Sequence, residues 1–296
     1  MDTSRKTPAA VARELRREAG FGCCVCGVPI LQYHHIVGWA QEQHFRPEDM
    51  MVLCPLHHDQ ATKGAMPEPE QRRFKANPYN IQRGVAKGLL AVRQDYCAAD
   101  LGSVTIVGEG PFIRIDGENI LSFHIGEGNL EISLRLFSET DEPLLEIDRN
   151  EWIAGDPLPW DIEADWQKLT IRERARQISV SLNAKPVPLK LRGELWRGGK
   201  RVRFDAGGIS IDGATQKFGI GELALVGMVL GIDTNKVSVG PSPQNPHAMF
   251  VSWPNRRERL WKARDAWRKI RAKSNGGNPS CGRGADVAPD LLPGPL

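Results

Sequence analysis

The chain has 296 residues, enough for one large or two ordinary domains, and its 41% hydrophobic and 25% charged residues are typical of a soluble globular protein. The longest apolar run, Leu223 to Ile232, is about half as long as a membrane-spanning helix, so no membrane segment is expected. The first twenty residues are charged throughout, which is not typical of a secretory signal.

The net charge of +3 is unevenly distributed along the chain. Residues 101–245 carry 16 Lys and Arg against 21 Asp and Glu, whereas residues 246–296 carry 10 against 4. Because a DNA-binding surface should be basic, we do not expect the acidic central region to bind nucleic acid across its whole face. Most of the six cysteines cluster near the N-terminus, which favours a reducing, cytoplasmic location over a disulfide framework.

The N-terminal segment predicts a helix that starts at Thr7-Pro8 and ends at Gly20. Val11 and Leu15 would share one face of this helix. Arg16 and Arg17 would lie largely on another face, and we expect them to contact backbone phosphates. A solvated charged face is the alternative for these two arginines.

Two short pairs of metal-binding residue types follow the helix. Cys23 and Cys26 form the first pair, and Cys54 and His57 form the second pair about 28 residues later. Two such pairs closing on one ion are typical of a tetrahedral structural zinc site. Cys24 could replace Cys23 as a ligand, but its spacing to Cys26 is too tight for a normal pair, so we expect it to be buried without metal.

Three histidines, His34, His35 and His58, lie between and beside these pairs and are not needed by the zinc. The stretch ILQYHHIV predicts a strand, MMVL predicts its partner, and PLHHDQATK predicts the first turns of a helix. Strand alternation would point the adjacent histidines to opposite faces, so one of them must lie at a bend or strand end if both serve one site. The three histidines are therefore candidates for a second ion.

The order Cys-x2-Cys-Gly, His-His-Ile and Leu-Cys-x2-His-His resembles the HNH (His-Me finger, ββα-metal) endonucleases, in the subgroup braced by structural zinc. The resemblance covers roughly residues 10 to 85 and implies DNA as the substrate. It implies His35 as general base and His34 and His58 as ligands of a catalytic Mg²⁺ or Mn²⁺ ion. It also implies a zinc set of Cys23, Cys26, Cys54 and His57, in which the histidine replaces a more usual cysteine.

Asp49 stands where this family has an Asn. The position could still brace the loop by hydrogen bonding, or it could offer a carboxylate to the catalytic ion, and we include it among the candidate catalytic residues. His44, in the loop between the strands, is expected to be a solvated residue, with phosphate contact as the alternative.

The residue types also fit the chemistry of phosphodiester cleavage. The reaction needs an activated water, stabilisation of charge on the phosphoryl oxygens and help for the leaving oxygen, and one neutral histidine with one hard cation can supply all three. The competing hypothesis is a non-catalytic zinc-finger protein that binds nucleic acid. A purely structural finger would have no reason to keep His34, His35 and His58 together.

The segment after the finger predicts a short helix near Glu68 to Lys75 and a second helix or extended arm near Ile81 to Arg93. It is rich in cations, and a solubilising linker is the alternative to phosphate binding. The predicted nucleic-acid-binding residues are Arg16, Arg17, Lys63, Arg72, Arg73 and Lys75.

From about Ser103 the sequence changes to short alternating strands separated by Gly, Asn, Asp and Pro turns, which predicts a sandwich, a barrel or a β-solenoid. We expect this part to regulate the finger, to bind a protein partner or to self-associate. A basic amphipathic helix and a Gly- and Pro-rich tail follow. The predicted fold class is α+β. Its divisions are a finger at 1–85, an arm at 86–102, a β-rich domain at 103–245, a basic helix at 246–273 and a disordered tail at 274–296.

Overall fold

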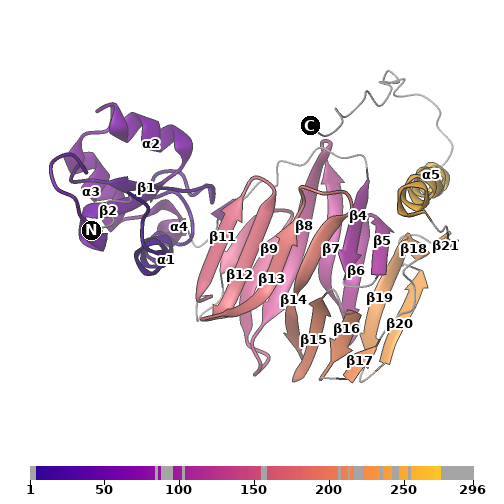
Figure 1. Cartoon of the computed structure of the whole chain (residues 1–296). Coiled ribbons are helices and arrows are strands. Elements are labelled where there is room, and N and C mark those ends of the chain that lie inside the picture. The colour runs from indigo at the N-terminus through magenta and orange to yellow at the C-terminus, as the bar shows by residue number, and fades with distance from the viewer. Residues whose placement is uncertain are drawn as a thin grey trace, which may run out of the picture.

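The computed structural model describes residues 5–83, 86–87, 96–101, 104–154, 159–205, 208–212, 214–216, 223–233, 236–241, 247–252 and 255–274. It is an α+β structure made mostly of strands, with few helices among the described residues and one long helix near the C-terminus. This confirms the predicted fold class at that level. A small N-terminal body lies beside a larger two-layered β-structure (Figure 1).

The N-terminal body is built from short elements around one two-stranded sheet. In chain order they are α1 (Ala9–Glu18), β1 (Gln32–His35), the short 3-10 turn η1 (Pro47–Asp49), β2 (Met50–Leu53), α2 (Pro55–Thr62), α3 (Glu68–Ala76) and α4 (Tyr79–Arg83). Strands β1 and β2 pair in antiparallel register, with His34 opposite Met51 and His35 opposite Met50. All four residues of β2 are buried, and with Leu15 they form the centre of this body's core.

The β-structure consists of two sheets. Its strands are β3 (Ala86–Lys87), β4 (Cys97–Leu101), β5 (Val104–Gly108), β6 (Gly110–Ile115), β7 (Glu118–Gly126), β8 (Asn129–Phe137), β9 (Pro143–Asp148), β10 (Glu151–Ala154), β11 (Asp161–Asp165), β12 (Lys168–Arg174), β13 (Gln177–Asn183), β14 (Leu189–Arg197), β15 (Lys200–Asp205), β16 (Gly208–Ile211), β17 (Ala214–Gln216), β18 (Leu223–Val226), β19 (Met228–Asp233), β20 (Lys236–Pro241) and β21 (Met249–Ser252).

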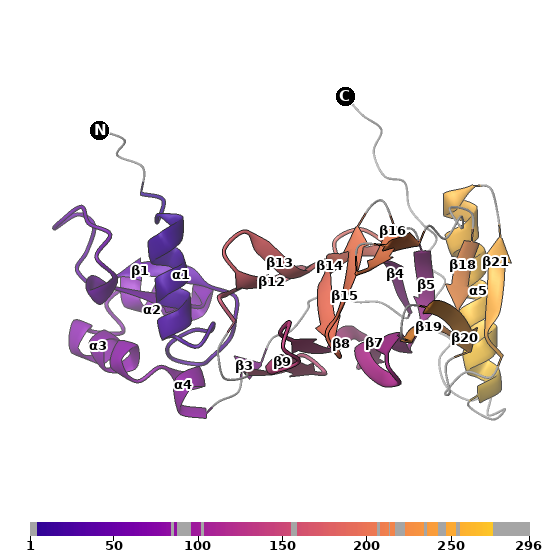
Figure 2. The same ribbon diagram turned by 90° about the horizontal axis from the view of Figure 1, so that it is seen from below.

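One sheet has eight strands in the order β20-β19-β6-β7-β8-β9-β10-β3, and the other has 11 strands along the path β11-β12-β13-β14-β4-β5-β18-β21, with β15, β16 and β17 branching from β14. Seen from below, the two sheets form separate layers (Figure 2). Of the three predicted architectures, two stacked sheets correspond to the sandwich. Strands β3 and β4 precede residue 103 and β21 follows residue 245, so the sheets extend past the predicted limits on both sides.

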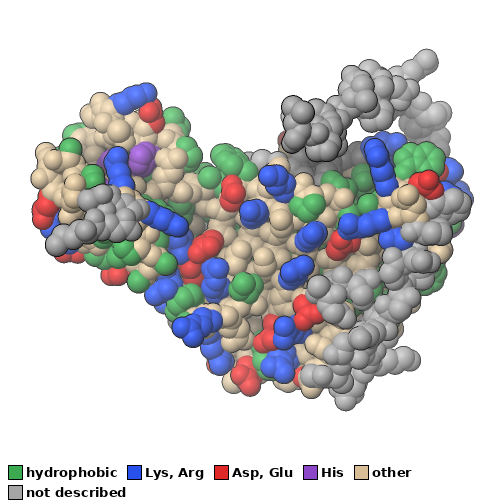
Figure 3. Space-filling view, in the orientation of Figure 1, with side chains coloured by type: hydrophobic (Ala, Val, Ile, Leu, Met, Phe, Trp, Pro, Cys, Tyr) green, Lys and Arg blue, Asp and Glu red, His purple; other side chains and the backbone are tan. Residues whose placement is uncertain are grey.

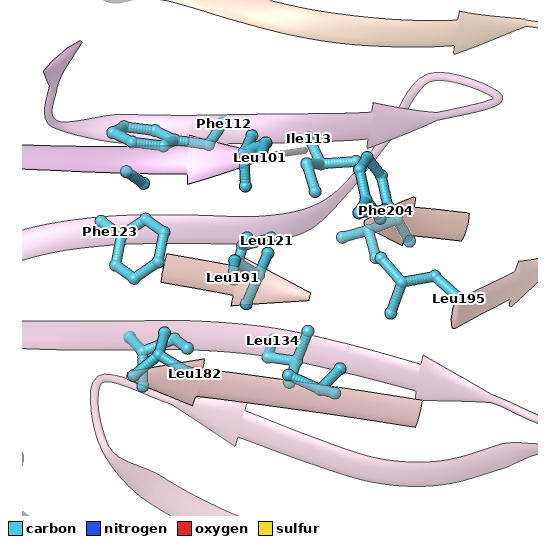
Figure 4. Close-up of a cluster of buried hydrophobic side chains, with 14 of the residues drawn as sticks. Leu101, Phe112, Ile113, Leu121, Phe123, Leu134, Leu182, Leu191, Leu195 and Phe204 are labelled. Atoms are coloured by element: carbon cyan, nitrogen blue, oxygen red, sulfur yellow. The ribbon is translucent and has the colours of Figure 1, made fainter. Parts of the chain in front are cut away.

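The core of the sandwich lies between the two layers. Leu121 of β7 faces this space from one sheet and Leu191 of β14 from the other (Figure 4). Phe112 and Phe123 pack edge to face with ring centroids 5.0 Å apart. Burying a side chain of this size contributes about 1.5–3 kcal/mol, so the alternating apolar residues predicted from the sequence are what hold the layers together.

Helix α5 (Arg256–Ser274) packs on the outer side of β5 and β18 through Ala263, Trp267 and Ile270. This agrees with the predicted amphipathic helix and its apolar stripe. Residues 88–95 of the predicted arm and residues 275–296 of the predicted tail lie outside the described residues.

A buried ion pair joins the finger to the sandwich. The Arg16 side chain of α1 donates to both carboxylate oxygens of Asp161 in β11, at 2.9 and 2.7 Å, and it also contacts the Tyr33 hydroxyl. Arg16 is 7% exposed and Asp161 is 3% exposed. The prediction that Arg16 contacts phosphate is therefore wrong, because its guanidinium is enclosed by a carboxylate that follows 145 residues later in the chain.

We expect Asp161→Ala to lower the free energy of unfolding by about 3–5 kcal/mol, because it leaves the Arg16 charge buried without its partner. Glu163→Ala is the matched control, since the Glu163 side chain also contacts Arg16 but is 48% exposed. Its loss should cost less than about 1 kcal/mol. Urea denaturation of both full-length variants measures the difference, and equal costs would show that burial of the Asp161 pair is not what matters.

Candidate functional site

Four side chains from two segments converge in the finger. Cys23 and Cys26 lie on the turn before β1, while Cys54 and His57 lie at the start of α2. The Nδ1 atom of His57 is 3.5 Å from Cys23 Sγ and 3.2 Å from Cys54 Sγ, and the Sγ atoms of Cys26 and Cys54 are 3.8 Å apart. The candidate ligand atoms of all four residues lie within 4.8 Å of one another.

These distances fit a metal ion such as zinc. With Zn–S bonds of about 2.3 Å and Zn–N bonds of about 2.0 Å, tetrahedral coordination requires S–S edges of about 3.8 Å and S–N edges of about 3.5 Å. The three separations observed among the cluster atoms lie close to these values. Of the two adjacent cysteines, Cys23 lies in the cluster and Cys24 does not. Cys24 is buried, and burial raises the pKa of its thiol to about 12.

The turn that carries Cys26 is held by α4. Asn80 donates to the carbonyl oxygens of Gly20 and Gly27, at 3.0 and 3.1 Å. Gly27 has a φ of +76°, and a Cβ atom at this position would lie 2.1 Å from Asn80 Oδ1. The close approach requires glycine, and it packs α4 against the turn that carries Cys26.

His34, His35 and His58 line one open cavity of about 460 Å³ beside this cluster. His34 and His35 point to opposite sides of β1, but His35 is the last residue of the strand, where the chain turns away. His58 reaches the same cavity from α2, next to the metal-ligand candidate His57. A histidine of the finger is visible on the surface in Figure 3.

His35 is held by the loop that follows β1. Its Nε2 atom is 3.1 Å from the carbonyl oxygen of His44. A carbonyl can only accept, so Nε2 carries the proton and Nδ1 keeps a free lone pair. The ring also contacts the rings of Trp39 and His44, with centroids 5.1 and 5.2 Å away. Burial lowers the pKa of His35, which favours the neutral form that can accept a proton.

His34 and His58 face each other, with ring centroids 5.2 Å apart and the rings nearly perpendicular. Gln71 of α3 donates its Nε2 to Met66 O, which turns its Oε1 toward His34 Nε2 at 3.1 Å. His34 Nδ1 is therefore the nitrogen with a free lone pair. Burial, followed by the nearby His58, lowers the pKa of His34 to about 4, and burial, followed by Arg5, lowers that of His58. Both rings are thus in the neutral form that ligates metals.

Asp49 does not line the cavity. Its carboxylate accepts hydrogen bonds from Arg46, at 2.9 Å, and from Arg72, at 3.2 Å. The Arg46 hydrogen bond is the main cause that lowers the pKa of Asp49, so the side chain stays ionised and paired. Of the two roles left open by the sequence, the structure places Asp49 as a brace for the loop that carries Arg46.

None of the other predicted nucleic-acid-binding cations is among the residues that line the histidine cavity. Arg17, Arg72 and Lys75 line a separate groove of about 780 Å³ between α1 and α3. Four of these cations are paired with neighbouring carboxylates, in the pairs Lys63–Asp59, Arg72–Glu68, Arg73–Glu70 and Lys75–Glu18. The number of Lys and Arg residues in a segment therefore did not identify which cations line the candidate site.

Several residues that line the cavity could not be identified from the sequence. Arg5, Trp39 and Gln71 line it, although none belongs to a spaced motif. His44 was expected to be solvated, but it is 7% exposed, and its Nε2 donates to Val37 O at 3.0 Å. His44 lies in the loop between two predicted strands, and this position is the feature of the sequence that could have indicated a role in holding the loop.

No helix in the described part of the chain is both long and apolar enough to span a membrane. Comparisons of the chain with protein-family models, with curated proteins and with solved structures give no match. The candidate site therefore has to be interpreted from its own geometry and chemistry.

Proposed function

We propose that this protein is a metal-dependent endonuclease that hydrolyses phosphodiester bonds in DNA, with His35 as the general base. The observation that carries the proposal is that His34, His35 and His58 line one open cavity while the Cys3His cluster lies directly beside it. A closed cluster that could hold structural zinc gives such a small body rigidity, and the three histidines beside it are free for chemistry.

In this proposal His35 Nδ1 accepts a proton from a water molecule as the water oxygen forms a bond to phosphorus. The bond from phosphorus to the ester oxygen breaks, and the leaving oxygen takes a proton from solvent. The hydrogen bond from Nε2 to His44 O fixes the ring in the tautomer that this step needs. Arg5, which lines the same cavity, supplies positive charge next to the phosphoryl oxygens.

The facing rings of His34 and His58 would hold the catalytic ion, and a divalent ion bound there supplies Lewis-acid stabilisation of the phosphoryl and leaving oxygens. Imidazole nitrogen suits transition ions, whereas Mg²⁺ prefers oxygen ligands. Of the two ions expected from the sequence, the donor set therefore suits Mn²⁺ better than Mg²⁺, and Ni²⁺ would suit it as well. The Gln71 contact would orient His34 as a ligand.

The alternative function is a zinc finger that binds nucleic acid without cleaving it. The hydrogen bonds of His34 with Gln71 and of His35 with His44 fit this alternative equally well, because packed structural histidines form such bonds too. The two functions differ in what added metal does to activity. A non-catalytic finger would show no cleavage at any concentration of divalent ion.

We expect His34→Ala and His58→Ala to weaken binding of the catalytic ion, so that cleavage lost at low Mn²⁺ is partly restored at high Mn²⁺. Mass action can refill a site that has lost one ligand. Titration of cleavage rate against Mn²⁺ measures the effect, with Gln71→Ala expected to shift the midpoint by about 10- to 100-fold.

His124→Ala is the matched control, because His124 is a partly buried histidine on β7 of the sandwich. Its Mn²⁺ dependence should equal that of the unmodified protein. Rates for His34→Ala and His58→Ala that are equally low at every Mn²⁺ concentration would contradict their role as ligands.

A further inference from the structure

The outward face of the 11-stranded sheet carries a group of cations, although residues 101–245 as a whole have more acidic than basic residues. Lys168 of β12, Lys190 of β14 and Arg192 of β14 are all exposed. The adjacent residues Leu169 and Leu191 are buried in the core. Because successive side chains of a strand point to opposite faces, the three cations point outward. We call Lys168, Lys190 and Arg192 the basic face.

Strand register places these cations close together. Lys168 pairs with Asn183, which pairs with Lys190, and in the next outward row Thr170 pairs with Ser181, which pairs with Arg192. Lys168 and Lys190 are therefore two strands apart, about 10 Å, and Arg192 lies about 7 Å along β14 from Lys190. Hydroxyl and amide side chains fill the intervening positions, and these groups also donate to phosphate oxygens.

The basic face is not neutralised within the described part of the chain. Among the described residues no ion pair is found for Lys168, Lys190 or Arg192, although Asp165 lies opposite Lys168 in the pairing of β11 with β12. Other carboxylates at the borders of the basic face have partners elsewhere. Glu163 contacts Arg16 and Arg172, and Asp100 contacts Arg256. Carboxylates such as Glu163 and Asp100 thus pair with other cations, and Lys168, Lys190 and Arg192 remain available to an external anion.

The outer face of the other sheet is different. Arg135 is paired with Glu146, and Arg149 is paired with Glu131. Arg114 donates to Gly117 O at 2.6 Å. Lys168, Lys190 and Arg192 have no such ion pair among the described residues, in contrast to Arg135 and Arg149.

The sheet that carries the basic face touches the finger through β11, whose own outward residues are the carboxylates Asp161, Glu163 and Asp165. Strand β11, at the edge of this sheet, forms a parallel bridge from Ala164 to Ile30, just before the strand with the catalytic candidates. Arg13 of α1 stacks over the Trp160 ring at 4.0 Å. Figures 1 and 2 place the 11-stranded sheet on the side turned to the viewer in Figure 1, and in the same orientation Figure 3 shows Lys and Arg side chains over the sandwich and a finger histidine.

We propose that the basic face binds the phosphate backbone of the DNA segment that flanks the bond placed in the histidine cavity. This inference rests on the proposed function, because a DNA strand bound at the histidine cavity would bring its repeating phosphate charge to the exposed cations of the neighbouring sandwich. Exposed cations spaced like these, with hydroxyl groups between them, match the repeating charge of a nucleic-acid backbone. Trp166, 51% exposed in the turn before Lys168, adds an aromatic ring next to the finger that can stack on an exposed base.

The test is a triple variant of the full-length protein, Lys168→Ala, Lys190→Ala and Arg192→Ala. Binding of a fluorescent duplex of about 30 base pairs is measured by anisotropy between about 50 and 200 mM salt, without divalent ion. We expect the affinity to fall about 10- to 100-fold and the slope of log K against log salt to become shallower by about 2 to 3, because each phosphate contact contributes about 0.9. A duplex of about 10 base pairs, about 34 Å long, should show a smaller effect.

The matched control removes three arginines from the opposite sheet, Arg114→Ala, Arg135→Ala and Arg149→Ala, and should leave the affinity and slope unchanged. An unchanged slope in the Lys168, Lys190 and Arg192 variant, or equal losses in both variants, would overturn the inference. Failure of the unmodified protein to bind the duplex would also overturn the inference. The same holds if the triple variant binds the duplex normally and loses only its binding to anionic lipid vesicles. Failure of the proposed function gives a different result. The unmodified protein would then show no cleavage but would still bind the duplex in a salt-dependent way through the basic face.

Discussion

In His35→Ala we expect the rate of DNA cleavage to fall about 10²- to 10⁴-fold, the usual contribution of a positioned general base. The substitution removes the nitrogen that accepts the proton of the attacking water, while His34 and His58 keep their own contacts on the other side of β1. Raising the Mn²⁺ concentration should therefore restore little activity. This separates His35→Ala from the two ligand variants, in which added ion refills the site.

Loss of the His35 ring also removes its hydrogen bond to His44 O, so a structural effect has to be measured separately. We expect a loss of stability of about 1–3 kcal/mol, because the substitution removes this bond and also the ring contacts with Trp39 and His44. Zinc content, urea denaturation and DNA binding of His35→Ala provide these readouts, and His124→Ala is the control for a general histidine effect. A His35→Ala protein that cleaves at the unmodified rate would show that another group is the base.

Cys54→Ser is expected to have the largest effect on folding. Cys54 contributes a sulfur atom to the Cys3His cluster, and its carbonyl accepts the hydrogen bond from His58 N in the first turn of α2. Zinc binding to small fingers is worth about 10–16 kcal/mol, which exceeds the net stability of an ordinary domain. Loss of one ligand should therefore unfold the finger and displace His58 from the cavity.

The matched control for Cys54→Ser is Cys24→Ala, which removes a buried cysteine that the cluster does not include. We expect Cys24→Ala to keep about one zinc per chain and a modest loss of stability, typical of a small buried side chain. Elemental analysis and circular dichroism of both variants measure the difference. A folded Cys54→Ser finger, or unmodified protein that folds without metal, would contradict the structural role of the cluster.

The cluster itself could be predicted from the sequence because its ligands come in two short pairs, each held by local chain geometry. Cys23 with Cys26, and Cys54 with His57, are close in sequence, and closing them on one ion is the simplest arrangement. The alternation rule likewise predicted that the adjacent histidines diverge, and His35 at the end of β1 explains how both reach one cavity.

Long-range partners could not be predicted in the same way. Nothing in the local sequence around Arg16 indicates that Asp161 encloses it, and the helix alone would leave that guanidinium in solvent. The burial of His44 depends on a loop folding back over His35. The charge balance of residues 101–245 gave no sign of the basic face, since opposite charges are separated only when the strands are aligned in register.

The sandwich was one of three architectures that the alternating strands allowed. Such a pattern fixes which residues face inward but not the order of strands, because every half-buried strand alternates in the same way. The parallel neighbours β4 and β14, and β6 and β19, bring together segments separated by many turns. These pairings decide that the strands form two stacked sheets, and they arise only in the folded chain.

The central claim, metal-dependent cleavage of DNA at the histidine cavity, is tested most directly on a supercoiled plasmid. Purified full-length protein with a measured content of about one zinc per chain is incubated with the plasmid, either with Mn²⁺ or with EDTA. We predict conversion to nicked and linear DNA with Mn²⁺ and none with EDTA. A plasmid that stays supercoiled with folded, zinc-containing protein at every concentration of Mn²⁺, Ni²⁺ and Mg²⁺ would contradict the proposed endonuclease.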